Sequence, residues 1–332
     1  MQRAAGTYRK GLAEVLLCYI LWGIFPVFWK QLSMLNSFYV LASRIVWSAL
    51  FCFVIVLCWK YMAELKRILC DKKQMALLAG SSVMIAINWG AYIYAVNSGH
   101  IVDASLGYYL SPLLSIAMAF LLFREPMKKL QWVAIAIAVA GIALAVSGYG
   151  AVPYFAIIIS ISFSIYGTIK KMVSCTGVVS TLIEAMMLCP FALAFIAFSE
   201  YTHMGAVGVL SPLQWLLIPA TGVVTSVPLL AFSNGISKVP LSVSGILMYI
   251  NPTIQLLLGV VLYNEGMDAS KWVMFVCIWV AIVLFLVSGN SLPKKREVSV
   301  QKSGIKNGTT RSTVTDTGCS EQNENQIQEG LL

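Results

Sequence analysis

Long apolar runs separated by short polar segments recur along almost the whole chain. Each run is about 18 residues or longer, which as a helix crosses a hydrocarbon core about 30 Å thick. The pattern predicts ten membrane-spanning helices joined by short connections. Their approximate positions are residues 12–29, 38–59, 75–96, 102–123, 130–148, 152–169, 178–199, 213–235, 241–263 and 271–289.

The composition agrees with this pattern. Of 332 residues, 59% are hydrophobic and 11% are charged, and the mean hydropathy is +0.81. An ordinary soluble domain has about 25% charged residues. The first apolar run follows basic residues as a signal peptide does, but no small-residue cleavage site follows it, so we expect a retained helix. The sequence therefore predicts an all-α polytopic membrane protein whose first partner is the lipid bilayer.

The net charge of +9 reflects where the basic residues lie. If ten helices alternate in direction, both termini and every second connection lie on the same side of the membrane. The segments on that side hold the seventeen Lys and Arg residues named below, and the connections on the opposite side hold only Lys30 and Lys271. Basic residues concentrate on the cytoplasmic side of membrane proteins. We therefore expect both termini in the cytoplasm and no nucleic-acid partner. The seventeen are Arg3, Arg9, Lys10, Lys60, Lys66, Arg67, Lys72, Lys73, Arg124, Lys128, Lys129, Lys170, Lys171, Lys238, Lys294, Lys295 and Arg296.

Two further features concern the tail and the metal-binding residue types. Residues 293–332 are polar and contain few large apolar side chains, which predicts a disordered cytoplasmic tail.

The eight cysteines form no CxxC pair, and most lie within apolar runs. His100 and His203 are isolated from each other and from other ligand types. We expect no disulfide, no metal site and no cofactor.

The chain contains an internal repeat. The stretch YLSPLLSIAMAFLLFRE at 109–125 aligns without gaps on YINPTIQLLLGVVLYNE at 249–265 when the chain is shifted by 140 residues. A repeat of five helices is odd in number, so the second copy enters the membrane from the opposite side. Inverted repeats are typical of transporters with a substrate site between the halves, although a duplicated structural bundle is an alternative. The matching pairs are Tyr109 and Tyr249, Pro112 and Pro252, Glu125 and Glu265, Met127 and Met267, and Trp132 and Trp272.

The repeat predicts the domain organisation. We expect a first five-helix repeat at 1–150 and a second, inverted one at 151–292. A proline inside a helix removes a hydrogen-bond donor, which membrane helices tolerate where neighbours or a cavity satisfy the freed carbonyl. We therefore predict kinks at Pro112 and Pro252. The fourth and ninth helices should face each other, with Tyr109 and Tyr249 toward a central cavity.

Several short motifs resemble one known family. Taken together they are similar to RarD-type members of the EamA family, in the drug/metabolite transporter superfamily, over nearly all of residues 10–290. The chain differs from the common family pattern at Ser43 and Met248. The motifs are Trp22-Gly23 with Pro26 and Lys30, Arg44 with Trp47-Ser48, Asn88-Trp89, Ser105 to Tyr108 with Pro112, Glu125, Gln131-Trp132, Tyr166-Gly167, Ile183-Glu184, Pro228-Leu229, Tyr249 with Pro252-Thr253, and Glu265.

The resemblance implies ten helices as two inverted EamA-like repeats. It also implies a location in the cell (inner or plasma) membrane and export or exchange of small molecules. It leaves the substrate open.

Charged side chains within the predicted helices are candidates for chemistry, because an ionisable group at the centre of a membrane helix costs at least about 2.5 kcal/mol. Arg44 and Glu184 qualify and are related by the same shift of 140. Arg44 could bind an anionic or polar substrate group, and Glu184 could carry a proton or attract a cation. The alternatives are structural pairs of Arg44 with Asp103, and of Glu184 with backbone or a lysine such as Lys171.

Three other glutamates lie near predicted helix ends. Glu14 is a second candidate for proton coupling, although an interfacial charge is the more ordinary interpretation. Glu125 and Glu265 close the helices that follow the two prolines. We expect them to bind loop amides or helix starts rather than substrate.

An aromatic and amide set occupies the middle of several predicted helices. Rings supply stacking area, and hydroxyl or amide groups fix orientation in a cavity. Aromatic residues at helix ends are more often interface anchors. From this set we predict a substrate path formed by Asn88, Trp89, Tyr109, Tyr166, Tyr249 and Gln255, together with Arg44 and Glu184.

These features predict a secondary transporter of a small metabolite or drug-like molecule that works by alternating access, as an exporter or exchanger. No Walker A motif is present, so we expect no ATP hydrolysis by this chain. The alternatives are a receptor or assembly factor and an intramembrane enzyme. We expect no enzymatic activity, since histidine or aspartate constellations suited to intramembrane catalysis are lacking. A homodimer is left open.

Overall fold

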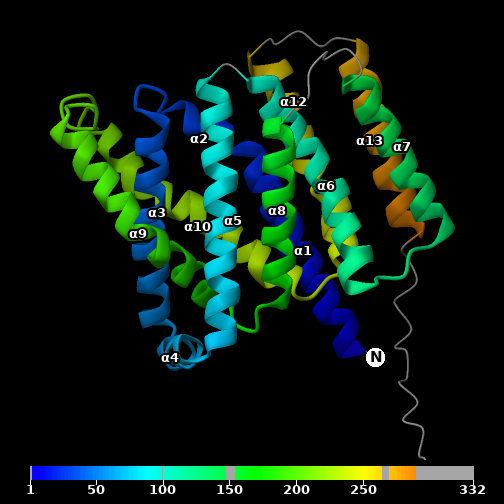
Figure 1. The fold of residues 1–332 in the computed structure, drawn as a ribbon, viewed down its shortest axis with the longest axis horizontal. Coiled ribbons are helices and arrows are strands. Elements are labelled where there is room, and N and C mark those ends of the chain that lie inside the picture. Colours follow the sequence, from blue (N-terminus) through cyan, green and yellow to red (C-terminus); the bar gives the residue numbers. More distant parts are fainter. Residues whose placement is uncertain (1, 99, 147–153, 264–268, 289–332) are drawn as a thin grey trace, which may run out of the picture. The chain divides into compact units, whose positions relative to one another are not determined.

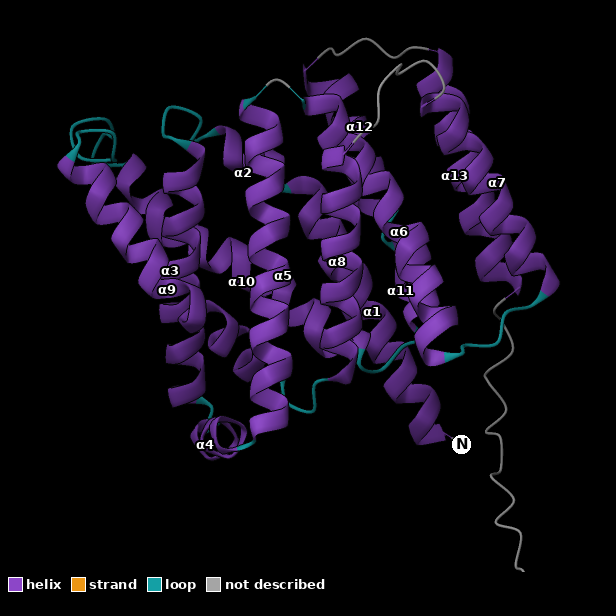
Figure 2. Cartoon of the chain, in the orientation of Figure 1, coloured by secondary structure: helices purple, strands orange, loops and turns teal. Residues whose placement is uncertain are grey.

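The computed structural model describes all residues except 1, 99, 147–153, 264–268 and 289–332, so the predicted tail lies outside the described residues. The described part is helical and contains no strand (Figure 1, Figure 2). Its helices are α1 (Gln2–Ile24), α2 (Pro26–Lys30), α3 (Ser37–Cys58), α4 (Met62–Cys70), α5 (Lys72–Asn97), α6 (Ile101–Phe123), α7 (Lys129–Val146), α8 (Tyr154–Met172), α9 (Gly177–Tyr201), the 3₁₀ turn η1 (Gln214–Leu216), α10 (Leu217–Ile236), α11 (Leu241–Leu247), α12 (Ile250–Tyr263) and α13 (Ala269–Ser288).

The helices have the length and surface of membrane-spanning segments. Within the described residues, eight helical segments are long and apolar enough to cross a bilayer, and Lys129–Leu144 and Trp272–Ser288 are shorter apolar helices. Large apolar side chains are exposed along them, including Phe191 (76% exposed) and Val261 (74%). Such surfaces are stable against lipid and costly in water. The chain is a multi-pass membrane protein, and the number ten remains a prediction.

The helix boundaries differ from the predicted ones in three places. The first predicted helix is divided at Phe25, because Pro26 starts the separate helix α2. The predicted helix at 241–263 is divided into α11 and α12, with a break at Met248 and Tyr249. A proline ring clashes with the carbonyl four residues earlier, and Met248 is that residue for Pro252. The short helix α4 was not predicted, because its apolar positions are too few to span a membrane.

Polar side chains fix where two of the long helices begin. Asn36 Oδ1 accepts a hydrogen bond from the Phe38 amide (2.9 Å) at the start of α3. Asp71 Oδ1 accepts bonds from the Lys73 (3.0 Å) and Gln74 (3.1 Å) amides at the start of α5. These side chains replace hydrogen bonds that the first turn of a helix cannot make internally.

Small residues allow the helices to pack closely. The packed pairs include α3 with α9 and α10, α5 with α8, α6 with α8 and α11, α1 with α10 and α12, and α7 with α13 (Figure 1). A Cβ on Gly222 of α10 would lie 2.4 Å from the Trp47 carbonyl carbon of α3. A Cβ on Gly141 of α7 would lie 2.6 Å from Cys277 Cβ of α13. Close backbone approach at small residues is the usual means of helix association in membranes.

Several connections gather on one face of the helix bundle. There the α8–α9 connection meets α4, because the Thr176 amide donates to Glu64 Oε1 (2.9 Å). Lys238, after α10, pairs with Glu14 on α1 (2.5 Å). We call this end of the bundle, formed by α4, the start of α1 and the α6–α7, α8–α9 and α10–α11 connections, the basic face. Helix α2 lies at the opposite end (Figure 1).

Candidate functional site

A cavity of about 460 Å³ lies between helices from both halves of the sequence. This volume is in the range of about 300–1,000 Å³ that is typical of small-molecule sites. Residues of α1, α2, α3, α5 and α6 line it from the first half, and residues of α8, α10 and α12 line it from the second. Lys30, Ser33 and Ser37 line its end near α2 and are exposed. The cavity therefore reaches the surface at the end opposite the basic face.

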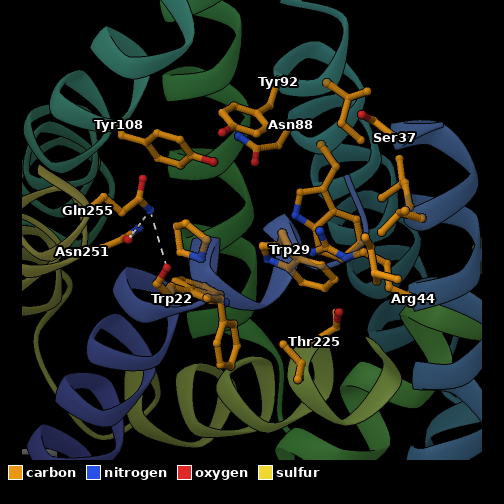
Figure 3. A pocket seen from close by; sticks show the side chains of 18 of the residues that line it. Trp22, Trp29, Ser37, Arg44, Asn88, Tyr92, Tyr108, Thr225, Asn251 and Gln255 are labelled. Carbon is orange, nitrogen blue, oxygen red and sulfur yellow. Dashed lines mark hydrogen bonds between the residues drawn. The ribbon is translucent and has the colours of Figure 1, made fainter. Parts of the chain in front are cut away.

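The two sides of the cavity differ in chemistry. In Figure 3, Tyr108, Asn251 and Gln255 lie on one side, and Trp29 and Arg44 lie on the other. Gln255 Nε2 donates to Asn251 Oδ1 at 2.7 Å, one turn away on α12. One side therefore offers amide and phenol groups, and the other offers a guanidinium and an indole ring.

Arg44 holds its guanidinium close to two indole rings. Its Cζ lies 4.2 Å from the centroid of the Trp89 ring and 5.1 Å from that of the Trp29 ring. Its Nε is buried and makes no hydrogen bond with any described residue. The described ion pairs also do not include Arg44. The side chain of Asp103, its predicted structural partner, lies outside the described residues.

Asn88 connects the cavity wall to α8. Its side chain is 3% exposed, and its Nδ2 donates to Ile159 O (2.8 Å) and Ser162 Oγ (3.2 Å). The neighbouring Trp89 supplies the ring closest to Arg44. A fixed amide at Asn88 therefore holds the segment of α5 that presents Trp89 to the cavity.

An aromatic layer lies next to the cavity. The Trp22 and Phe163 rings, which line the cavity, have centroids 5.7 Å apart. Phe232 contacts Trp22 (5.7 Å) and stacks on Tyr166 at 5.9 Å. Tyr19 joins the layer through Trp22 (6.0 Å) and Phe232 (6.3 Å). We call these five residues the aromatic layer; Tyr19, Tyr166 and Phe232 are at most 1% exposed, so the layer is closed to solvent.

Glu184 lies in a buried polar network adjoining this layer. Lys170 Nζ is 2.9 Å from Glu184 Oε1, and the two side chains are 1% and 5% exposed. Ser81 Oγ donates to the same oxygen at 2.5 Å, and Lys170 also donates to Ser180. The Tyr166 hydroxyl lies 3.5 Å from Glu184 Oε2. An ion pair and several hydrogen bonds thus offset the cost of burying two charges.

A smaller void of about 20 Å³ lies between the cavity and Glu184. Trp89 and Thr225 line both spaces, and Glu184 and Thr181 line the void. The Thr181 and Thr225 hydroxyls are buried and have no hydrogen-bond partner among the described residues. The volume is enough for about one water molecule, and the lining residues include Thr181, Thr225 and Glu184. Polar groups therefore lie between the cavity and the carboxylate.

The predicted path residues fall into three groups. Arg44, Asn88, Trp89 and Gln255 line the cavity, and Tyr166 and Glu184 line the void together with Trp89.

The third group is Tyr109 and Tyr249, which pack in the hydrophobic core and line neither space. Their neighbours Tyr108 and Met248 line the cavity instead. On α6, the position next to Tyr109 points about 100° away, and Met248 and Tyr249 lie in the break between α11 and α12. A role for Tyr109 and Tyr249 on the substrate path stays a prediction.

The glutamates near helix ends make local contacts. Glu125 accepts hydrogen bonds from the Leu241 (2.7 Å) and Ser242 (3.0 Å) amides at the start of α11, as expected for a residue that binds a helix start. Glu14 pairs with Lys238. Glu265 lies outside the described residues.

The two prolines have different surroundings. Pro112 lies inside α6, which continues unbroken from Ile101 to Phe123, whereas the break between α11 and α12 precedes Pro252. A Cβ on Gly245 of α11 would lie 3.2 Å from Pro112 O. The predicted contact between the fourth and ninth helices is therefore present as the packing of α6 on α11.

The sequence did not single out several of the residues at these sites. Lys170 follows an apolar run directly before Lys171, which is typical of an interfacial pair, so its burial gave no signal. Lys171 instead lies 3.8 Å from Glu125. Asn251 could have been found, because it lies four residues before Gln255 and shares its helix face. Among the described residues, no group of three His, Cys, Asp or Glu could hold a metal ion.

One loop thiol has a shifted pKa. Burial raises the pKa of Cys175, between α8 and α9, to about 11. Its thiol is therefore almost fully protonated at neutral pH, and protonated thiols are poor nucleophiles.

Comparison with known proteins places this architecture in a family. The EamA-like transporter family matches residues 9–147 and again residues 152–287. The chain belongs to the EamA-like transporter family. Within it the chain is a RarD-type member of the drug/metabolite transporter superfamily, because relatives named RarD align over most of its length.

Two of the relatives are more than a third identical to this EamA-like chain over the aligned residues. It is 40% identical over 283 residues to an uncharacterized transporter, YojE, of Bacillus subtilis, covering 84% of this chain and 94% of that protein. It is 34% identical over 283 residues to protein RarD of Escherichia coli, with the same two coverages. A solved crystal structure 14% identical to the chain superposes with a TM-score of 0.64 and covers 86% of this chain and 100% of that one. That last similarity concerns the fold alone.

Proposed function

We propose that the protein is a secondary transporter that moves a small metabolite or drug-like molecule by alternating access, as an exporter or exchanger. The observation that carries the proposal is the 460 Å³ cavity, which is lined by both halves and reaches the surface at the α2 end. Toward the basic face it is followed by buried residues of the aromatic layer and by the buried Lys170–Glu184 pair. A substrate site between two repeats is the common arrangement in secondary transporters.

The pairing of helices supports an inverted repeat. The family matches the chain once in each half. The shift of 140 residues takes α3 onto α9, α6 onto α11 with α12, and α7 onto α13, and each of these pairs packs together. The same shift takes α1 onto α8 and α5 onto α10. The contact of α1 with α10 therefore corresponds to the contact of α8 with α5, and both contacts are present. Helices related by a two-fold axis between the halves would pack in this way.

The closed side of the path consists of two kinds of contact. The aromatic layer lies against the cavity and adjoins the buried Lys170–Glu184 pair. Farther out, Lys171 with Glu125 and Lys238 with Glu14 connect segments of the basic face. Opening toward this face would require these contacts to separate, and closing the α2 end would require the cavity walls to meet there.

We propose Glu184 as the residue that couples transport to protons. The void shares the lining residues Trp89 and Thr225 with the cavity and is also lined by Glu184, so a water molecule there and the Thr181 and Thr225 hydroxyls would give a proton a route to the carboxylate. Among the described residues, the titratable groups near the Glu184 carboxylate are Lys170, Tyr166, Cys52 and Cys175. Protonation of Glu184 would remove one charge from the ion pair and loosen the closed side. Glu14, which pairs with Lys238 at the basic face, is the less favoured candidate.

We also propose that the basic face is cytoplasmic, as the distribution of Lys and Arg predicts. Cys70 ends α4 on this face and is exposed. A membrane-impermeant maleimide should label Cys70 only after cells are permeabilised, and should label a Ser33→Cys variant in intact cells. Cys175 should react slowly at pH 7 and faster as the pH rises toward its pKa of about 11. Labelling of Cys70 in intact cells would reverse the orientation.

The direct test is an uptake screen in proteoliposomes. Labelled amino acids, nucleosides and antibiotics of different charge are offered to the purified protein with and without a pH gradient. We expect at least one compound to accumulate, and we expect Glu184→Gln to abolish the effect of the gradient while substrate exchange remains. If uptake by Glu184→Gln keeps its pH dependence, the coupling role is lost while the transport function stands.

The alternatives make different predictions. A receptor or assembly factor would move no compound, and Glu184→Gln and Arg44→Ala would behave as wild type in cells that depend on the protein. That combined result would overturn the proposed transport. An intramembrane enzyme would release a changed product rather than the labelled compound itself, which chromatography of the vesicle contents distinguishes.

A further inference from the structure

We propose that the cavity binds a small organic anion, with a carboxylate held by the in-plane donors of Arg44, an apolar planar body against the aromatic walls, and a hydrogen-bonding group at the amide side. The inference rests on the proposed function only in taking the bound anion as the transported substrate. The binding site itself is independent of transport.

The surroundings of Arg44 favour an anion at the edge of its guanidinium plane. The Trp29 and Trp89 rings lie 5.1 and 4.2 Å from its Cζ and cover the guanidinium. Its N–H groups point outward in the guanidinium plane, and Nε is buried without a partner among the described residues. A guanidinium that stacks near indole rings and keeps an edge donor without a partner among the described residues matches the geometry of a bidentate carboxylate.

The charge of the cavity lining also favours a negatively charged ligand. The described residues that line the cavity include the cations Arg44 and Lys30 and no Asp or Glu. A charge in a surrounding of low dielectric constant interacts more strongly with a ligand than the same charge in water. A guanidinium in a membrane helix with no ion-pair partner among the described residues is also costly. A bound anion would offset that cost, whereas a bound cation would add to it.

The remaining lining selects an organic anion over an inorganic one. Trp22, Trp29, Trp89 and Phe163 present rings to the cavity and offer no replacement for the water shell of a small inorganic ion. Across the cavity from Arg44, Asn251 and Gln255 present amide groups (Figure 3). A molecule that fits all three parts has a carboxylate, a flat apolar body and an amide or hydroxyl group.

Three probes with the same indole body test the proposal. N-acetyl-L-tryptophan carries a carboxylate, N-acetyl-L-tryptophanamide is neutral, and L-tryptophanamide is a cation. Binding to the full-length protein in detergent is measured by equilibrium dialysis of the labelled compounds. We expect saturable binding of N-acetyl-L-tryptophan at millimolar concentration or below. The neutral amide should bind about 10- to 100-fold more weakly, as expected when a hydrogen bond to a charged group is lost.

Substitutions at Arg44 test whether this residue causes the preference for the carboxylate. Arg44→Gln should remove the preference for the carboxylate, and Arg44→Lys should keep only part of it, because lysine lacks the planar fork. The matched control is Arg67→Gln, since Arg67 is exposed on α4 of the basic face and, among the described residues, donates only to Ser174 O at 3.4 Å. This control should bind the three probes as wild type does. Because the probe series is read in the wild-type protein, the test does not depend on a variant that folds.

Three results would overturn the proposal: no saturable binding of the carboxylate, equal or tighter binding of the neutral amide or the cation, or an unchanged carboxylate preference in Arg44→Gln. Failure of the proposed function is a different result. If N-acetyl-L-tryptophan binds through Arg44 but neither it nor any compound in the uptake screen enters proteoliposomes, the anion site stands and transport falls. If uptake is confined to neutral or cationic compounds while N-acetyl-L-tryptophan still binds through Arg44, transport and the anion site both stand, and only the identification of the bound anion as the transported substrate falls.

Discussion

Arg44 and Glu184 occupy equivalent positions in the two halves of the sequence, yet their surroundings differ. Arg44 lies at a cavity that reaches the surface, with indole rings around its guanidinium and no described ion-pair partner. Glu184 is 4% exposed and pairs with Lys170 and Ser81. One half presents a charge to a cavity, and the other has its charge closed in.

The difference extends across the molecule. On the basic-face side, three carboxylates pair with lysines in order of increasing exposure. The Lys170–Glu184 side chains are 1% and 5% exposed, the Lys171–Glu125 side chains 17% and 14%, and the Lys238–Glu14 side chains 24% and 20%. Repeats of similar sequence that adopt an open and a closed arrangement are what alternating access needs, because an exchange of the two arrangements would move the opening to the other side.

The largest effect is expected at the buried pair. Lys170→Met leaves Glu184 without its cation in a site that is buried from bulk solvent. Removing one partner of a buried ion pair costs about 3–5 kcal/mol of unfolding free energy. Unfolding in mixed micelles with a rising fraction of SDS measures the change. The matched control is Lys171→Met, which removes a lysine one residue away whose carboxylate contact is longer and less buried, so its loss should be clearly smaller.

The double variant Lys170→Met with Glu184→Leu completes this test. It removes both charges and should recover much of the stability lost by Lys170→Met alone, because no uncompensated charge remains. If Lys170→Met is as stable as wild type, or if the double variant is the least stable of the three, the pair does not hold the closed side together.

An intermediate effect is expected at Glu125. Glu125→Ala removes the acceptor of the Leu241 and Ser242 amides and of the Ser242 hydroxyl at the start of α11. Loss of such a cap costs about 0.5–2 kcal/mol. Glu125→Gln keeps one acceptor oxygen and should lose less. The same micelle titration measures both, and equal losses in the two variants would contradict the capping role.

Much of the fold could be predicted from hydrophobic runs, because a membrane helix needs both length and apolar character. The ranges 38–59 and 178–199 lie within one or two residues of α3 and α9 at each end. The break between α11 and α12 could not be placed, since a proline signals a missing donor but leaves open whether neighbours keep the helix continuous. The unpredicted helix α4 is only nine residues long and spans nothing, so it leaves no hydrophobic run to find.

The candidate site could be predicted in part because ionisable residues in apolar runs are rare. That rule found Arg44 and Glu184, which lie at the cavity and at the void. It could not find Lys170, because a lysine at the end of a run is normally interfacial and only the approach of α9 buries it. The choice between Tyr108 and Tyr109 depends on helix rotation, which an apolar sequence in lipid specifies poorly because every face is hydrophobic.

A smaller effect is expected at the most exposed pair. Glu14→Gln removes the charge that Lys238 meets at the edge of the basic face. Partly exposed ion pairs are worth about 0–1 kcal/mol, so the change in unfolding free energy should be near the limit of measurement. Raising the salt concentration should reduce it further. A loss of unfolding free energy as large as that of Lys170→Met would mean that the stability contributed by the three ion pairs does not increase with their burial.

The smallest effect on stability is expected at Arg44, although the substitution is chemically the same as at Lys170. Arg44→Met also replaces a long cation with a long apolar side chain, but no described carboxylate is left unpaired by it. Lost cation–π contacts with Trp29 and Trp89 would lower the stability, and removal of an unpaired charge would raise it. These terms oppose each other, so the unfolding free energy should change by less than about 1 kcal/mol, while binding of N-acetyl-L-tryptophan is lost. A destabilisation as large as that of Lys170→Met would show that Arg44 belongs to a structural pair. A residue whose role is to bind a ligand contributes to the binding free energy and little to the stability of the ligand-free protein.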